Sequence, residues 1–514
     1  MSFQAVAVEK RLAPTVHNGS GMKTFAVAVA TMFSLEAGCI DQGPDDDDAS
    51  SMADDDGDGA PDESSQFDEI VARHSDQRNT LPNNVPVRDA TGIFTTVSAH
   101  GAIDLNNEFF QDLGGNGRRC VSCHVPTVGW TITPKQVRTV FDLTDGGAFE
   151  DGLGLSAIFR TVDGSNSPTA DVSTLAKRRQ AYSMLLTKGV IRIGLPIPAN
   201  AEFELIAVDD PYKFASARQL SLFRRPLPTT NLKFDSTVMW DGREVVPGAT
   251  VASELTTQAN SAAVAHAQTG PLSQTQRESI VAFETALASA QIVDRHAGDL
   301  RDDGARGGPD AILRQPFYIG INDNFGDSRT SAPFNPIVFD IFDRWAHARG
   351  GHHNERLSIA RGQALFNSKP IKIAGVSGIN DEDAFGKPAQ IIGTCTTCHN
   401  TPNGGNHSVV APLNIGLVDE SRRTPDMPLY TLRNKTTGAI VKVTDPGRAL
   451  IDGKWSHIGR FKGPMLRNLA PRAPYFHNGF AKDLDAVVDF YDERFAIGFT
   501  KQEKRDLAAF LRSL

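Results

Sequence analysis

The chain has 514 residues, a net charge of −9 at pH 7 and five cysteines. Neither its charge nor any basic run suggests nucleic-acid binding, and past the N-terminal segment no stretch approaches the ~20 uninterrupted apolar residues of a membrane-spanning helix. From about residue 70 onward the composition is that of an ordinary globular protein, long enough for two or three domains with cores of their own.

Residues 1–39 are predicted to be a secretory signal. If translation begins at Met22, a lysine provides the positive start, an apolar run follows over residues 24–35, and two small residues precede Cys39. A cysteine at this point is typical of a lipoprotein whose thiol is acylated, although Glu36 stands where an apolar residue is usual. We expect an exported protein, periplasmic or on the cell surface, and leave open whether a lipid at Cys39 anchors it to a membrane.

Residues 40–70 are predicted to form an acidic, disordered tether. Between Cys39 and Glu63 there are eleven acidic residues and no basic one, and such a segment repels itself. Without these charges the rest of the chain would carry +2, so the overall acidity says little about the partners of the folded part. Residues 54–62 alternate carboxylates with a turn glycine as calcium loops do, but they lack the glutamate that closes an EF-hand loop.

One short motif occurs twice, as CVSCH at residues 120–124 and as CTTCH at residues 395–399. Two thiols three positions apart lie on one side of a helical turn and can add to the vinyl groups of a porphyrin, and the following histidine then lies under the iron. A zinc ribbon or a thioredoxin-like redox pair is the alternative, but a ribbon needs its two cysteine pairs close together in sequence. We therefore predict two covalently bound c-type haems, held by Cys120, Cys123, His124, Cys395, Cys398 and His399.

The two motifs divide the folded part into a first haem unit, residues 71–340, and a second haem unit, residues 341–514. In the first unit, residues 107–113 are predicted to form a short helix before a glycine-rich turn and the motif. Abundant Gly and Pro indicate long ordered loops, with a short hairpin expected over 190–205.

The second haem unit is predicted to begin and end with a helix. Apolar residues share one face of a helix over 355–366, and a capping box of Thr500 and Glu503 begins the other. An N-terminal and a C-terminal helix that flank a haem are the arrangement of a cytochrome c domain. The expected fold is therefore mainly α, with two cytochrome c-type domains, long loops and little β structure.

Segments outside the motifs resemble bacterial dihaem cytochrome c peroxidases and their MauG relatives. These segments are residues 238–243 (VMWDGR), 361–366 (RGQALF), 461–468 (FKGPMLRN) and 473–479 (APYFHNG). With the ordered pair of motifs they cover the chain from about residue 100 to its end. The resemblance implies two helical cytochrome c domains that face each other across a calcium ion, a first haem that reacts with peroxide, and a second haem that takes in or stores electrons.

The resemblance also suggests an upper ligand for the iron of the second haem. Tyr491 corresponds to a position where peroxidases carry methionine and MauG carries tyrosine, and a phenolate would stabilise ferric iron. Met465 is the competing ligand. Either residue could instead be packing, Tyr491 on a helix face and Met465 in the core. Trp240 looks like the tryptophan that lies between the haems and shortens the path for electrons, which is compatible with a packing role as a buried loop anchor.

The distal side of the first haem departs from the family pattern. Relatives carry a Gln-containing helix followed by Pro and Glu, whereas the equivalent residues 258–268 contain Gln258, His266 and Gln268 but no acid. His266 could act as a general acid and base, because imidazole titrates near neutral pH, or could bind the iron and close the site. It could also be only a hydrogen-bonded helix residue. Gln258 and Gln268 would orient a bound oxygen species.

The family's calcium would be held by an Asn side chain and by backbone carbonyls. Asn231 is the side-chain candidate, and the carbonyls of Arg472 and Pro474 match the backbone donors. Asn231 could equally be a turn residue. The long segment between His124 and Trp240 contains paired arginines that could bind haem propionates or simply pack on the surface.

The predicted function is that of a dihaem oxidoreductase of the cytochrome c peroxidase and MauG type. Peroxide or dioxygen would react at the first haem, with Trp240 and the second haem relaying electrons from a small redox protein. Two alternatives stay open. One is a non-enzymatic electron-transfer cytochrome with both irons six-coordinate, and the other is a MauG-like or rubber-oxygenase-like oxidase of a protein or organic substrate.

Overall fold

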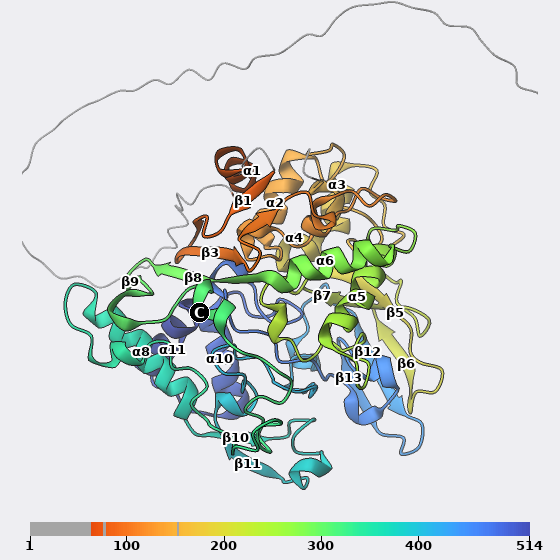
Figure 1. Ribbon diagram of the computed structural model, residues 1–514. Coiled ribbons are helices and arrows are strands. Elements are labelled where there is room, and N and C mark those ends of the chain that lie inside the picture. Colours follow the sequence, from red (N-terminus) through yellow and green to blue (C-terminus); the bar gives the residue numbers. More distant parts are fainter. Residues whose placement is uncertain (1–62, 76–78, 152–153) are drawn as a thin grey trace, which may run out of the picture. The chain divides into compact units, whose positions relative to one another are not determined.

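The computed structural model of the protein describes residues 63–75, 79–151 and 154–514 (Figure 1). The predicted signal and the calcium-like loop at residues 54–62 lie outside the described residues. Helix α1 begins at Glu63, so residues 63–70 are helical rather than part of a disordered tether. The reason is apolar burial, because Ile70 and Val71 of this helix pack against the core of the first haem unit.

The helices of the described residues fall on both sides of residue 340. The first haem unit and the segment before it contain α1 (Glu63–His74), α2 (Pro134–Leu143), α3 (Leu175–Ala181), α4 (Ser183–Lys188), α5 (Val251–His266), α6 (Gln274–Ala286) and α7 (Pro309–Arg314). The second haem unit contains α8 (His353–Ser368), α9 (Ala449–Asp452), α10 (Leu484–Phe495) and α11 (Lys501–Arg512). Figure 1 shows α8, α10 and α11 grouped together.

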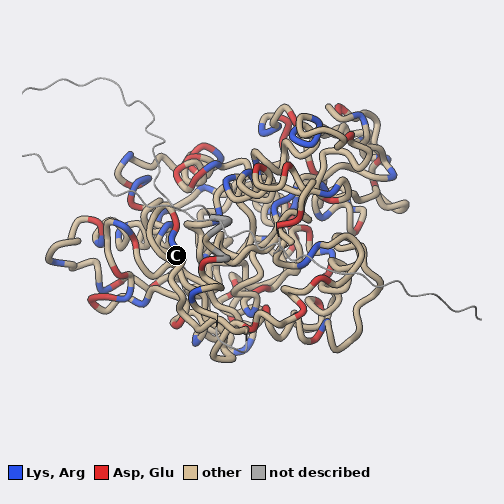
Figure 2. The backbone as a smooth tube through the Cα atoms, turned by 90° about the horizontal axis from the view of Figure 1, so that it is seen from above, with Lys and Arg blue, Asp and Glu red and all other residues tan. Residues whose placement is uncertain are grey.

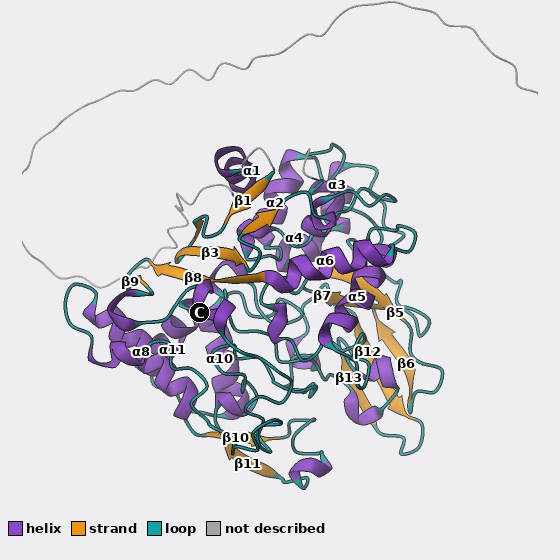
Figure 3. Cartoon of the chain, viewed as in Figure 1, coloured by secondary structure: helices purple, strands orange, loops and turns teal. Residues whose placement is uncertain are grey.

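The strands of the described residues form five small sheets (Figure 3). They are β1 (Thr80–Pro82), β2 (Val87–Asp89), β3 (Gly92–Ser98), β4 (Ala102–Asp104), β5 (Ile191–Leu195), β6 (Phe203–Asp209), β7 (Leu220–Arg224), β8 (Leu287–Asp294), β9 (Gly298–Asp299), β10 (Ile371–Ala374), β11 (Gln390–Gly393), β12 (Leu429–Asn434) and β13 (Ile440–Val443). The largest has the order β2-β3-β8-β9. The fold is mainly helical in outline, as predicted, but has more β structure than the sequence suggested.

The hairpin predicted over residues 190–205 is wrong. Both strands exist, but β5 pairs with β7, and β6 pairs with the distant strand β12, where Leu205 lies opposite Leu432. Two prolines in the connection, Pro196 and Pro198, restrict the backbone there. The sheet β13-β12-β6 therefore joins the first haem unit to the second.

The second haem unit is built on the two helices predicted at its ends. An added Cβ at Gly362 of α8 would lie 2.0 Å from the carbonyl oxygen of Asp506 in α11, so this close approach requires glycine. Arg361 donates two hydrogen bonds to the Asp506 carboxylate, at 2.7 and 2.8 Å. Thr500 caps α11 in a capping box with Glu503. Both predicted helices are confirmed.

The predicted helix over residues 107–113 is a single 3-10 turn, η1 (Glu108–Phe110), capped by the Asn107 side chain. It ends early because glycines follow. Gly115 has φ +101°, and an added Cβ would lie 2.4 Å from the carbonyl oxygen of Gln268. This contact brings the end of α5 close to the chain that enters the first motif.

Hydrophobic residues from both haem units share one core cluster, here called the joint core. Val125, Val128, Phe203, Leu432 and Phe461 belong to it, and the described residues form one unit by their contacts. Acidic and basic residues are interspersed along the described chain (Figure 2). Within the described residues, every helix is too short or too polar to cross a membrane.

Candidate haem sites

The two CxxCH motifs adopt the same local structure. Each begins with a 3-10 turn, η2 (Cys120–Ser122) and η9 (Cys395–Thr397). The backbone N–H of each motif histidine donates to the carbonyl of the first cysteine, at 3.0 Å in the first motif and 3.1 Å in the second. Both motifs therefore form one tight turn, which places two cysteines and a histidine together as covalent haem attachment requires.

The second motif opens into an apolar cavity of about 200 Å³. Its lining includes the predicted haem residues Cys395, Cys398, His399, Tyr491 and Trp240, together with His477. The sequence separates these residues by more than 200 positions, so only folding shows that they share one cavity. An apolar cavity with a few convergent polar groups is the usual form of a cofactor site.

The His399 ring is oriented for metal binding. Its Nδ1 lies 2.6 Å from the carbonyl oxygen of Gly405, and this contact fixes Nδ1 as the protonated nitrogen and leaves Nε2 with a lone pair. Burial lowers the pKa of the His399 imidazole, which keeps it neutral, as a metal ligand must be. These residues fit a c-type haem.

The described residues give neither cysteine pair the further ligands that a zinc ribbon needs. Among them no group of three or more His, Cys, Asp or Glu side chains could hold a metal ion. Burial raises the pKa of the Cys395 and Cys398 thiols to about 12. All four motif cysteines are free of disulfides, as thioether formation requires.

Of the two predicted upper ligands for the second iron, the structure brings only Tyr491 to the cavity. Tyr491 lies on α10 and lines the cavity with His399, and burial raises the pKa of its phenol. Met465 packs in another cluster, between Phe234 and Ile312. Met465 is therefore not among the cavity residues, although its neighbours in sequence, at 464 and 466, are.

The first motif lies between two core clusters. Cys120 packs against an aromatic cluster that includes Phe109, and Cys123 packs against the joint core. The ring centroid of Phe109 lies 6.3 Å from that of His124. Burial lowers the pKa of the His124 imidazole to about 4, and the nearby charge of His266 contributes to this shift. The structure thus brings His266 close to the predicted iron ligand of the first haem.

His266 has an acidic partner that the sequence did not reveal. Its Nδ1 lies 2.9 Å from Oδ2 of Asp163, and both side chains are only partly exposed. Asp163 is 103 residues away and sits at φ +55°, in a loop with no motif of its own. The His266 carbonyl accepts a hydrogen bond from Nη1 of Arg118 at 2.9 Å, two residues before the first motif. The buried Arg118 therefore ties the end of α5 to the motif.

The two predicted glutamines do not join His266 in one place. Gln258 lies on α5, eight residues before His266, which corresponds to about 12 Å along a helix. Gln268 lies beyond the end of α5, is exposed and has φ +56°. Neither is placed beside the His266–Asp163 pair.

Trp240 contacts both the second cavity and the joint core. It lines the second cavity and packs against the joint core, as Cys123 of the first motif does. Its indole Nε1 donates to the carbonyl oxygen of Arg225 at 2.8 Å. Its ring is 6.2 Å from His477, which stacks on Phe461 at 4.0 Å. A continuous row of aromatic rings therefore runs along this side of the cavity.

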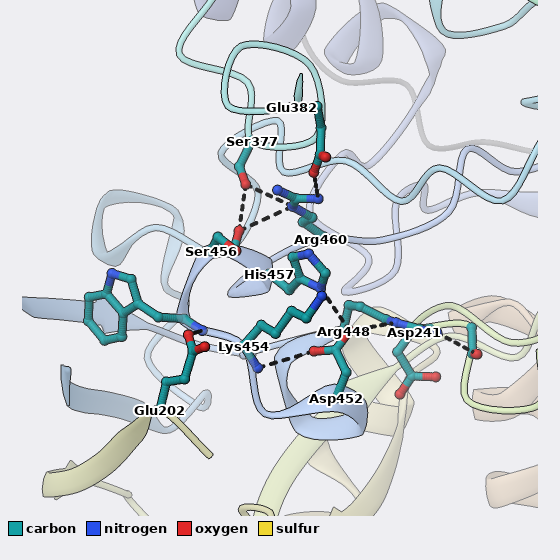
Figure 4. Close-up of polar contacts among 12 residues, drawn as sticks. Glu202, Asp241, Ser377, Glu382, Arg448, Asp452, Lys454, Ser456, His457 and Arg460 are labelled. Carbon is teal, nitrogen blue, oxygen red and sulfur yellow. Dashed lines mark hydrogen bonds and ion pairs between the residues drawn. The ribbon is translucent and has the colours of Figure 1, made fainter. Parts of the chain in front are cut away.

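The loop that carries Trp240 is held by charged residues. Nη1 of Arg448 donates to the carbonyl oxygens of Asp241 (3.2 Å) and Gly242 (2.7 Å), as Figure 4 shows for Asp241. The buried Asp241 carboxylate also pairs with Arg224 at 2.5 Å, and Arg224 pairs with Asp445 at 2.8 Å. These contacts fix the position of the loop that carries Trp240.

His477 is a second cavity residue that sequence reasoning missed. It is buried, and neither ring nitrogen has a hydrogen-bond partner within the described part of the chain. Burial lowers its pKa to about 4. A bound haem carries propionates and so offers partners that such a ring lacks. The only sequence signal was its place in the segment 473–479, which carried the family resemblance.

Glu284 on α6 was also missed. Its side chain is buried, burial raises its pKa to about 8, and its charge acts on Cys120 of the first motif. A glutamate in an amphipathic helix gives no sign of burial when read from the sequence. It is an acidic group near the first haem site, where the segment 258–268 has none.

Two of the three residues predicted to bind calcium, Asn231 and Arg472, are engaged by other groups. Oδ1 of Asn231 accepts from the backbone N–H of Ser289 at 3.2 Å, and its Nδ2 donates to the Ser289 carbonyl at 2.9 Å. The Arg472 carbonyl accepts from Nη2 of Arg225 at 3.0 Å. The oxygen atoms of Asn231 and Arg472 are thus taken by N–H groups rather than directed at a common metal position, so these residues do not fit a calcium ion.

Two proteins of known name are similar to part of the chain. Cytochrome-c peroxidase IdrP2 of Denitromonas iodatirespirans is 34% identical over 136 residues, which are 24% of this chain and 36% of the relative. Cytochrome-c peroxidase IdrP1 of Pseudomonas sp. (strain SCT) is 30% identical over 193 residues, 34% of this chain and 43% of the relative. The chain thus matches less than half the length of either protein.

No protein-family model matches the chain. The crystal structure of a MauG-like protein associated with microbial copper homeostasis aligns with 84% of this chain and 92% of its own, at 17% identity and a TM-score of 0.36. A TM-score this low does not by itself establish a common fold. The named peroxidases and the two haem-attachment motifs instead support the resemblance to the superfamily of bacterial dihaem cytochrome c peroxidases and MauG.

Proposed function

We propose that the protein is an exported dihaem oxidoreductase that reacts with peroxide or dioxygen at the first haem and draws electrons through the second. A bound haem supplies redox chemistry and an iron that can accept an oxygen ligand. Reduction of peroxide to two waters takes up two electrons and two protons, so the polypeptide has to deliver protons at the first site and connect the two sites.

The His266–Asp163 pair beside the first motif is the observation that carries this proposal. A cytochrome that only passes electrons has no need of a positioned acid and base, whereas oxygen–oxygen bond cleavage needs one. The Asp163 carboxylate holds Nδ1 of His266, which leaves Nε2 to accept a proton from one oxygen and return it to the other.

At the second site, His399 and Tyr491 are the residues that would hold the iron, because both line the same cavity. Trp240 would then lie on the electron path, because it lines this cavity and packs on the joint core that also contacts Cys123. Tyr491 in the cavity also favours a second candidate function, MauG-like oxidation of an organic or protein substrate, because a phenolate ligand stabilises higher iron oxidation states more than a thioether does.

Spectra of the exported holoprotein test the proposal. We expect two covalent haems by mass spectrometry and, in the ferric or half-reduced protein, one high-spin haem that reacts with peroxide. The His266→Ala variant should keep both haems and lose most of this reactivity. A protein that is low-spin in every redox state and ignores both peroxide and carbon monoxide would be an electron carrier instead.

A further inference from the structure

Arg225 is almost completely buried, and its guanidinium binds backbone carbonyls from distant parts of the chain. Nη2 donates to Ile132 at 2.7 Å and to Arg472 at 3.0 Å. Nη1 donates to Lys188 at 3.1 Å and to Gly189 at 3.4 Å. Three of these carbonyls belong to the first haem unit and one belongs to the second. No carboxylate takes part in these contacts, so the positive charge is balanced by carbonyl dipoles alone.

The backbone of Arg225 is bound to the second haem site as well. Its N–H donates to the carbonyl of His477 at 2.7 Å, and its carbonyl accepts from the indole of Trp240 at 2.8 Å. Both partners line the second cavity. One residue therefore holds together a loop that follows the first motif, the inter-site tryptophan and a wall of the second cavity.

Several features leave room for a guanidinium here and not for a metal ion. An added Cβ at Gly189 would lie 2.5 Å from Nη1 of Arg225, so a side chain there would displace the guanidinium. A second buried guanidinium, that of Arg472, lies close enough to lower the pKa of Arg225. A calcium ion placed beside these two cations would be repelled, and the Arg472 carbonyl is already occupied.

We propose that Arg225 is the internal cation of the junction between the two haem units and that it occupies the Arg472 carbonyl, which would otherwise be offered to a calcium ion. Burial lowers the pKa of the Arg225 guanidinium to about 9, with Arg472 adding to the shift, so the group stays charged at neutral pH. A planar group with five donors can satisfy several carbonyls at once, as a metal ion with oxygen ligands does.

Metal analysis and thermal unfolding of the exported holoprotein test this role without any measurement of peroxide activity. We expect the unfolding midpoint to be the same in excess calcium and in excess EGTA. Because residues 54–62 resemble a calcium loop, the metal content is measured on the D54N/D56N/D58N chain, in which we expect less than one calcium per molecule. One calcium per molecule whose removal lowers the midpoint would overturn the proposal.

Variants of Arg225 give the complementary test. R225A should lower the unfolding midpoint by several degrees and broaden the spectrum of the second haem, and millimolar guanidinium should restore part of the loss. The unfolding midpoint of R225K should lie between those of R225A and the wild type, because an ammonium cannot reach the carbonyls of both haem units at once. R138K is the matched control, since Arg138 donates to the single carbonyl of Leu186 within the first unit. An R225A protein that unfolds like R138K would also overturn the proposal.

Discussion

Nδ1 of His266 lies 2.9 Å from Oδ2 of Asp163, in a pair whose members are 103 residues apart. The contact determines what the imidazole can do. One ring nitrogen is held by the carboxylate, so the other is free to exchange a proton with a ligand. The carbonyl of His266 accepts a hydrogen bond from Arg118, which stands two residues before the first motif, so the end of α5 is held next to that motif. The acid and base role proposed for His266 rests on this geometry.

Replacing His266 with alanine should lower the rate constant for reaction of the first haem with peroxide by ~100-fold or more, the range for loss of a general acid and base. In the Asp163→Asn variant this rate constant should fall about 10-fold, because the His266 imidazole is held less firmly in its position. Stopped-flow absorbance measures both rates. H100A is the control, since His100 is exposed. An unchanged rate in H266A would assign this histidine to packing.

The sequence predicted those parts of the molecule that short segments encode. The CxxCH turns, helix α8 and the capping box of Thr500 depend on residues a few positions apart, and each appears as expected. Strand pairing does not depend on local residues. Both β5 and β6 are strands, but β5 pairs with β7 and β6 pairs with β12 rather than with each other.

The same distinction applies to the site. His399, Tyr491 and Trp240 were recognisable as single residues, but their common cavity depends on the tertiary fold. Asp163 could not be found because one aspartate in a loop carries no periodicity and no motif. The calcium prediction rested on the family resemblance, which does not reveal that Arg225 already binds the Arg472 carbonyl.

Tyr491 and Met465 make a matched pair of variants. The cavity contains Tyr491 but not Met465, so Y491F should change the ferric spectrum of the second haem and raise its reduction potential, because a phenolate stabilises ferric iron. M465L conserves side-chain volume in another core cluster and should leave the spectrum unchanged. A redox titration followed by absorbance measures both. The reverse result would make the methionine the ligand and would assign Tyr491 to packing.

Trp240 should matter for electron transfer more than for stability. W240F removes the hydrogen bond from the indole to the Arg225 carbonyl, and we expect a loss of about 1 kcal/mol in the free energy of unfolding. The rate of electron transfer between the haems should fall, because phenylalanine is smaller and much harder to oxidise. Flash reduction of the second haem, followed at the wavelength of the first, gives that rate. A normal rate in a folded W240F protein would place the electron path elsewhere.

Glu284 should make the stability of the holoprotein depend on pH. Burial raises the pKa of its carboxyl to about 8, above the ordinary value that it regains on unfolding. Between these two values the folded state holds a proton that the unfolded state has lost, so stability decreases as the pH rises from about 4.5 to about 8.

The Glu284→Gln variant should therefore unfold at a higher temperature than the wild type near pH 8 and at a similar temperature near pH 4.5. Thermal unfolding followed by the haem absorbance across this range provides the comparison. E278Q changes an exposed glutamate on the same helix, and its unfolding temperature should depend on pH as that of the wild type does. Parallel curves for E284Q and the wild type would mean that this carboxyl is ionised in the folded protein. Its charge would then have to be compensated at the first haem site, where it acts on Cys120.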